Sequence, residues 1–155
     1  MRIEEKEKRI KNSKYFFYKL SLIQNELKDK REYLEEFINK NSPAGYKKDL
    51  TQKEISIQET KKNYSAEILF KDFEEKINKL KLEIAKLENQ YIYLMGLIDK
   101  IEKFNSKYIL KSVFLYHLPK THIKKIFRIK NFEESLNESF INFSFILENE
   151  YKKKK

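Results

Sequence analysis

Residues 70–101, FKDFEEKINKLKLEIAKLENQYIYLMGLIDKI, carry apolar side chains at spacings that alternate between three and four residues nine times without a break. The members of this series are Phe70, Phe73, Ile77, Leu80, Ile84, Leu87, Tyr91, Leu94, Ile98 and Ile101. Such a seam is typical of a helix that packs along a partner helix. It predicts a helix over about residues 66–104, roughly 60 Å long at about 1.5 Å per residue. Gly96 falls outside the seam, so we expect the helix to continue through it.

A second seam precedes the first. Its members, at spacings of four and three in turn, are Phe16, Leu20, Ile23, Leu27, Lys30, Leu34 and Phe37. Lys30 is the one polar member, and its long side chain can carry the ammonium out of the seam and help to fix the register. The sequence SPAG at residues 42–45 predicts that this helix ends near residue 41.

Two seams joined by a polar loop near residues 42–65 predict an antiparallel helical hairpin, with a short helical stretch around residues 52–61 of the loop. The long helix can instead pair with its copy in a second chain, so a homo-oligomer stays open. We also leave open whether the hairpin closes within one chain.

Composition points to the same fold class. The 155 residues include two glycines, two prolines and no cysteine. Too few turn residues are present for a sandwich or barrel, and the isolated glycines exclude a phosphate-binding loop of the Walker or dinucleotide type. The longest apolar run, residues 91–98, is too short to span a membrane, and the first residues lack the apolar stretch of a signal peptide. We therefore expect an all-α protein of the cytoplasm, with no membrane partner.

The last third of the chain predicts three shorter helices. The first covers residues 107–117, with Asn105 or Ser106 as N-cap, and Pro119 ends it. The second covers residues 122–128 with Thr121 as its cap, and the third covers residues 132–150 after a tight turn at 129–131. A support helix followed by helix, tight turn and helix is the helix-turn-helix layout. The predicted domains are thus a helical hairpin, 1–104, and a helix-turn-helix-like module with a basic tail, 105–155.

Charge is distributed unevenly in this module. The chain carries 34 Lys and Arg against 24 Asp and Glu, a formal net charge of +10. Residues 106–130 hold seven cations and no acid, residues 131–150 hold five acids and no base, and residues 152–155 are four lysines. A basic stretch of this kind predicts binding to nucleic acid, mainly through phosphates. The predicted DNA-binding residues are Lys120, Lys124, Lys125, Arg128 and Lys130.

Three features of the chain resemble a known family: Ser42-Pro43 at the start of the loop, the long helix through Ile101, and the strings ILKSVFLY at residues 109–116 and LPKTHIKKIFRI at 118–129. Together they resemble phage-encoded regulators related to region four of sigma factors, among them the RinA and ArpU late-gene activators. The resemblance spans about residues 14–148. It implies a helical hairpin interrupted by a polar loop, a sigma-like helix-turn-helix, and a transcription regulator of a phage or mobile element with RNA polymerase as a possible partner.

The surface expected to contact DNA bases differs from that of a typical sequence-specific DNA-binding protein. In such a module the recognition helix begins at Phe132, and its groove-facing residues are drawn from Asn131, Glu133, Glu134, Asn137 and Glu138. Three of these are carboxylates, which repel phosphates and cannot make the bidentate contacts of arginine with guanine. Either the basic second helix and the tail supply the DNA contacts, or the module binds a protein.

The second alternative assigns partner binding to Glu133, Glu134, Asn137 and Glu138. The protein would then be a small phage inhibitor of a host nucleic-acid-handling defence complex, of the anti-CRISPR type. A third alternative is a structural coiled-coil adaptor in which neither charged face has a role.

Catalytic chemistry is not predicted. His117 and His122 are the only histidines and lack a third metal ligand nearby in the sequence. Acidic pairs such as Glu35-Glu36 are adjacent on a helix, so they point in different directions rather than forming an acid and base pair. We expect no enzyme activity, no bound metal and no cofactor.

Overall fold

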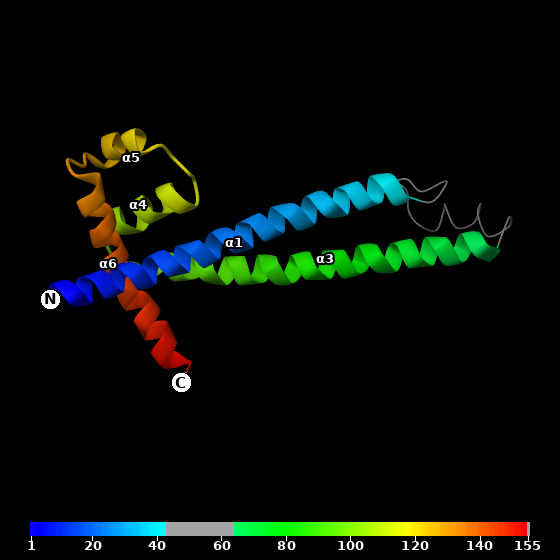
Figure 1. The fold of residues 1–155 in the computed structure, drawn as a ribbon, viewed down its shortest axis with the longest axis horizontal. Helices are drawn as coiled ribbons and strands as arrows, with labels where there is room; N and C mark the ends of the chain where they lie inside the picture. The colour runs from blue at the N-terminus through cyan, green and yellow to red at the C-terminus, as the bar shows by residue number, and fades with distance from the viewer. Residues whose placement is uncertain (43–63, 155) are drawn as a thin grey trace. The chain divides into compact units, whose positions relative to one another are not determined.

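The computed structural model describes residues 1–42 and 64–154, and each regular element in them is a helix. In chain order these are α1 (Ile3–Asn41), α3 (Tyr64–Asp99), α4 (Phe104–Phe114), α5 (Lys120–Phe127) and α6 (Phe132–Lys153) (Figure 1). The predicted all-α class is confirmed. The short helix expected around residues 52–61 lies outside the described residues. Within the described ranges, no helix has the length and apolar character needed to cross a membrane.

Contacts divide the chain into two compact units. The first consists of Met1–Gln24 and Gln90–Lys155, and the second of Asn25–Asn89. Both α1 and α3 contribute a part to each unit. This grouping differs from the predicted division after residue 104, because Phe16 and Phe17 of α1 are buried in one cluster with Phe140 and Phe143 of α6.

The second unit is an antiparallel helix pair. Residues late in α1 contact residues early in α3: the Phe37 and Phe73 rings stack with centroids 5.5 Å apart, and Lys30 Nζ lies 3.1 Å from Glu83 Oε2. The seam side chains Leu27, Phe73, Ile77, Leu80 and Ile84 are buried, as both periodic patterns predicted. The ion pair also carries the Lys30 ammonium out of the seam, as expected from its long side chain. The hairpin therefore closes within one chain.

The core of the first unit is aromatic. Its buried residues are Phe16, Phe17, Leu20, Leu97, Ile98, Ile101, Leu110, Phe140 and Phe143. Phe17 stacks on Phe114 of α4 with ring centroids 4.2 Å apart, and Phe16 meets Phe143 edge-on at 4.7 Å. Beside them, the buried Ser13 Oγ donates a 2.6 Å hydrogen bond to the Phe140 carbonyl, so α1 and α6 approach closely at a small residue.

A smaller apolar cluster holds α4, α5 and α6 together. Ile109, Ile123 and Phe132, one from each helix, are buried against one another, and Leu136 and Phe127 pack on them. A short turn joins α5 to α6 as predicted, but it covers residues 128–131 rather than 129–131. The three C-terminal helices thus share a core of their own.

The helix boundaries of this region differ from the predicted ones. α3 ends at Asp99 and α4 begins at Phe104, because Lys100 and Ile101 donate backbone hydrogen bonds to Leu97 and Ile98 in a tighter turn. Capping by Asn105 or Ser106 was therefore wrong: the N-cap is Lys103, and Ser106 is buried, where it accepts a 2.8 Å hydrogen bond from Asn142 Nδ2.

The next two junctions show how proline and asparagine set helix starts. α4 ends at Phe114, three residues earlier than expected, and α5 begins at Lys120 with Pro119 as its N-cap, so capping by Thr121 was also wrong. The fixed φ of proline, −61° here, directs the chain into the helix without a side-chain cap. α6 has a true side-chain cap, because Asn131 Oδ1 accepts a 3.2 Å hydrogen bond from the Glu134 amide, and it extends to Lys153.

Candidate nucleic-acid interface

The predicted DNA-binding lysines lie on one side of α5. Ile123 is buried and Phe127 half-buried on the inner side, whereas Lys120 and Lys125 are exposed and Lys124 is half-buried. At about 100° per residue these three lysines fall within roughly 140° of arc, beside the inner face. The two apolar anchors therefore fix the direction in which the lysines project.

Arg128 and Lys130 extend this basic surface into the turn that follows α5. Both are exposed, and Arg128 adopts the left-handed conformation with φ 54°. That conformation ends α5, because the next amide, Ile129 N, bonds back to the Lys124 carbonyl at 2.9 Å. Glycine is usual at such a position, so an arginine costs about 1 kcal/mol there.

The basic surface has little acidic neutralisation within the protein. In the described part of the chain, one cation of residues 106–130 forms an ion pair, Lys111 with Asp99. The hydrogen bond from Lys111 to Asp99 raises the pKa of Lys111 above its ordinary value of 10.5, although burial acts in the opposite direction. Lys111 is thereby removed from the basic surface. Lys120 makes a different contact, with its ammonium 5.3 Å from the centre of the Phe132 ring.

The predicted partner-binding residues occupy the first turns of α6. Glu133 and Glu134 are exposed, and no ion pair involves them within the described residues. Glu138 is exposed and lies 3.8 Å from Lys103, whereas Asn137 is half-buried. The side chain of Asn131 is engaged as the helix cap, so this member of the expected reading set has a structural role.

One groove brings part of the two predicted sets together. Its volume is about 640 Å³, and Arg128, Lys130 and Glu138 all line it, together with Lys103 and Ser135. Lys120, Lys124, Lys125, Glu133, Glu134 and Asn137 are outside its lining. The groove thus has a mixed charge, and Arg128 and Lys130 belong both to it and to the basic surface that continues from α5.

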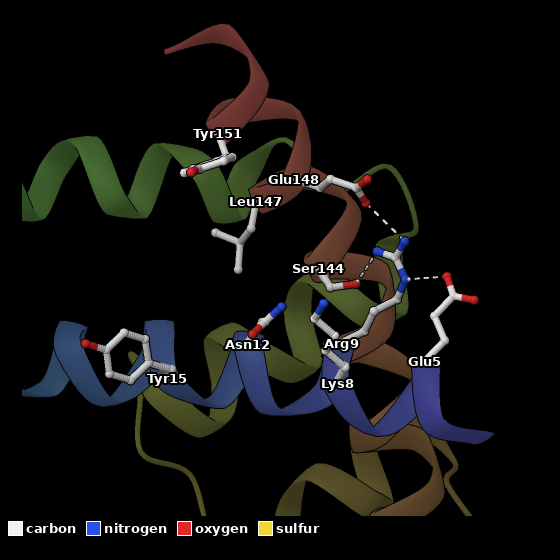
Figure 2. Close-up of a pocket in the computed structure, with 9 residues that line it drawn as sticks. All are labelled: Glu5, Lys8, Arg9, Asn12, Tyr15, Ser144, Leu147, Glu148 and Tyr151. Atoms are coloured by element: carbon white, nitrogen blue, oxygen red, sulfur yellow. Dashed lines mark hydrogen bonds and ion pairs between the residues drawn. The ribbon is translucent and has the colours of Figure 1, made fainter. Parts of the chain in front are cut away.

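A second groove was not predicted from the sequence. It has a volume of about 760 Å³ and is formed by α1 and α6 (Figure 2). Its lining consists of Glu5, Lys8, Arg9, Asn12, Tyr15, Ser144, Leu147, Glu148 and Tyr151. In Figure 2, Leu147 projects from α6 toward α1, and Arg9 extends from α1 toward Ser144 and Glu148.

Arg9 joins the two walls of that groove. Its guanidinium lies 3.0 Å from Glu148 and 3.3 Å from Glu5, donates to Ser144 Oγ at 3.2 Å, and covers the Phe145 ring at 3.9 Å. The hydrogen bond from Arg9, reinforced by one from Lys152, lowers the pKa of Glu148 from its ordinary value. The guanidinium of Arg9 thus pairs with carboxylates and donates hydrogen bonds on both helices, so Arg9 links α1 to α6.

The net charge belongs to one of the two units. Residues 25–89 contain fourteen cationic and fourteen acidic side chains. Residues 1–24 and 90–155 together contain twenty cationic and ten acidic side chains. The excess of +10 therefore lies in the unit that holds both grooves and the α5 surface.

Comparison with known proteins gives no further guide. No protein-family model, no curated protein and no solved structure matches this chain. The likeness to sigma-like phage regulators stays a hypothesis supported by residue pattern and helix order. His117 and His122 are exposed, and among the described residues no group of three His, Asp or Glu side chains is placed to hold a metal ion.

Proposed function

We propose that this protein is a DNA-binding transcription regulator of a phage or mobile element, acting in the host cytoplasm and similar in organisation to sigma-like late-gene activators. It contacts the phosphate backbone through Lys120, Lys124, Lys125, Arg128 and Lys130. The observation that carries the proposal is that these five cations lie on α5 and its turn without an acidic partner in the described part of the chain. Cations that are not neutralised within the protein can contact phosphates, and helix-turn-helix proteins present such cations to DNA.

Salt dependence tests this proposal quantitatively. Five phosphate contacts give a slope of about −4.5 in log K against log salt concentration, or roughly a 500-fold loss of affinity between 50 and 200 mM salt. Fluorescence anisotropy with a labelled duplex from upstream of the chain's own gene measures this slope. The variant Lys120→Glu/Lys125→Glu should bind more weakly, whereas Lys79→Glu/Lys81→Glu, exposed on α3, is the control of equal charge change. No binding at 50 mM salt, or a flat salt response, would refute the proposal.

Sequence preference is expected to be small. The exposed start of α6 presents Glu133 and Glu134, and a glutamate can accept a hydrogen bond from the amino group of cytosine but not read guanine. A shuffled duplex of equal length should therefore bind nearly as well. Recruitment of RNA polymerase, rather than base reading, would then supply promoter choice.

A second function is favoured by the same two carboxylates. Because Glu133 and Glu134 are exposed and unpaired among the described residues, this end of α6 offers an acidic surface to a basic protein. The protein would then inhibit a host nucleic-acid-handling defence complex, as an anti-CRISPR protein does, through Glu133, Glu134, Asn137 and Glu138.

A pull-down from host lysate separates the two functions. A protein partner held by this surface survives nuclease treatment and is lost with Glu133→Lys/Glu134→Lys, but is kept by the control Glu35→Lys/Glu36→Lys on α1. A regulator bound to DNA loses its co-purifying proteins on nuclease treatment, except polymerase subunits that it contacts directly. If both double variants retain every captured protein, the acidic surface is not the binding site.

A further inference from the structure

The solvent-facing side of α1 in the first unit has an unusual composition. Residues 8–25 contain five cations and no acid. The inner side of this stretch is taken up by the aromatic core, in which Ser13, Phe16, Phe17 and Leu20 are buried. The outer side is formed by the exposed residues Lys8, Lys11, Asn12, Tyr15, Tyr18, Lys19 and Leu22, and we call it the α1 outer face.

The lysines of the α1 outer face are available to an anionic ligand. Ion pairing in this stretch falls on Arg9, and in the described part of the chain no acidic side chain pairs with Lys8, Lys11 or Lys19. Lys19 instead places its ammonium 4.6 Å from the centre of the Tyr15 ring. The Lys19 ammonium therefore covers one face of the Tyr15 ring.

Two aromatic rings of this face are exposed to solvent. Tyr15 and Tyr18 are 58% and 59% exposed, and Leu22, one turn further along, is 48% exposed. Residues three apart lie on the same side of a helix, about 4.5 Å apart along its axis. Exposed rings between phosphate-binding cations are the arrangement on which unpaired bases stack in proteins that bind single strands. The bases of a duplex are covered by their neighbours, so a duplex cannot use these rings.

The groove of Figure 2 continues this surface. Lys8, Asn12 and Tyr15 belong both to the α1 outer face and to the groove lining, where Leu147 and Tyr151 of α6 form the other wall. Glu5 and Glu148 are both paired with Arg9 in this groove. The apolar wall formed by Leu147 suits the flat face of a base.

We propose that the α1 outer face binds single-stranded nucleic acid, with Lys8, Lys11 and Lys19 on phosphates and bases stacked on Tyr15 and Tyr18. This site is separate from the α5 surface and does not depend on it. A membrane surface fits less well, because an interfacial helix inserts its apolar side, and the apolar side of α1 is buried in the protein core.

Tryptophan fluorescence tests the stacking directly, because the chain has no tryptophan. Tyr15→Trp and Tyr18→Trp each introduce a single reporter, and Tyr33→Trp, 47% exposed on α1 in the other unit, is the matched control. Titration with a 20-nucleotide oligo(dT) should quench the reporters at positions 15 and 18 and leave the control unchanged. Binding of oligo(dT) without quenching at either position, or absence of binding at 50 mM salt, overturns the proposal.

Affinity measurements complete the test. Tyr15→Ala/Tyr18→Ala should weaken oligo(dT) binding about 10-fold or more, the effect of losing base stacking. Lys11→Glu/Lys19→Glu should lower the salt slope by about 1.4, whereas the control Lys79→Glu/Lys81→Glu leaves it unchanged. Failure here is distinct from failure of the proposed regulator: Lys120→Glu/Lys125→Glu affects duplex binding and leaves the tryptophan quenching intact. Tighter binding of polyglutamate than of oligo(dT) to the α1 outer face would show a site for an acidic protein and overturn the proposal.

Discussion

Replacing Phe17 by alanine tests whether the C-terminal helices fold against the start of α1. Phe17 is 2% exposed, stacks on Phe114 with centroids 4.2 Å apart, and lies 5.3 Å from Phe143 and 6.1 Å from Phe140. Loss of a buried phenylalanine costs about 3–5 kcal/mol, and aromatic pairs add about 0.5–1.5 kcal/mol beyond the buried area. Because partners from α4 and α6 surround the ring, we expect the upper part of this range, about 4–5 kcal/mol.

Guanidinium chloride unfolding followed by circular dichroism measures this loss. The matched control is Phe104→Ala at the start of α4, because that ring is 66% exposed and its truncation should cost less than about 1 kcal/mol. If Phe17→Ala costs no more than Phe104→Ala, the first stretch of α1 is not part of the aromatic core. The grouping of residues 1–24 with 90–155 would then be wrong.

Three further predictions follow from local features of the same unit. Gly96→Ala should raise the unfolding free energy by up to about 1 kcal/mol in a thermal melt, because the added methyl group meets no atom within 4 Å. Arg128→Gly should leave the unfolding free energy unchanged or raise it by about 1 kcal/mol, since glycine adopts the left-handed conformation without strain. The same variant should lower the salt slope of duplex binding by about 1, whereas Arg128→Lys should leave the slope unchanged. Arg9 lowers the pKa of Glu148 below 4.5, so the pair stabilises the fold above pH 4.5 and loses its effect as pH falls through the folded-state pKa. Unfolding midpoints of the wild type and Glu148→Gln should therefore converge below pH 4.5, and a constant gap would contradict the assignment.

The parts of the fold predicted from sequence are those that depend on local periodicity. The seams beginning at Phe16 and Phe70 predicted both long helices, although not the start of α1 at Ile3, because an apolar residue every three or four positions indicates a helix and its packed side. The break after the long helix was predicted at residues 105–106 but lies at residues 100–103, since the seam continues to Ile101 while the chain turns to bring α4 onto the core. That turn depends on packing against residues distant in the sequence, so it cannot be predicted from neighbouring residues alone.

Charge patterns predicted the sites only in part. The acid-free stretch at residues 106–130 pointed to α5, but the partner of Lys111 is Asp99 on a different helix, so its neutralisation was not visible in a run of sequence. Residues 8–25 also contain five cations and no acid, and no site was predicted there. Tyr15 and Tyr18 are positioned between seam residues, and their exposure became apparent only with the helix orientation.

The division of charge between the two units bears on the proposed binding of nucleic acid. Residues 25–89 are neutral overall, and where Lys30 and Arg31 meet α3 they pair with Glu83 and Glu88 across the helix pair. Such a unit exerts little long-range attraction on a polyanion, because its net charge is zero and salt screens individual charges beyond about one Debye length, roughly 8 Å at physiological salt. The other unit carries the whole excess of +10, concentrated on α5 with its turn, the start of α1 and the lysine tail. Under the proposed function, electrostatic steering of DNA or of a single strand therefore acts on this unit.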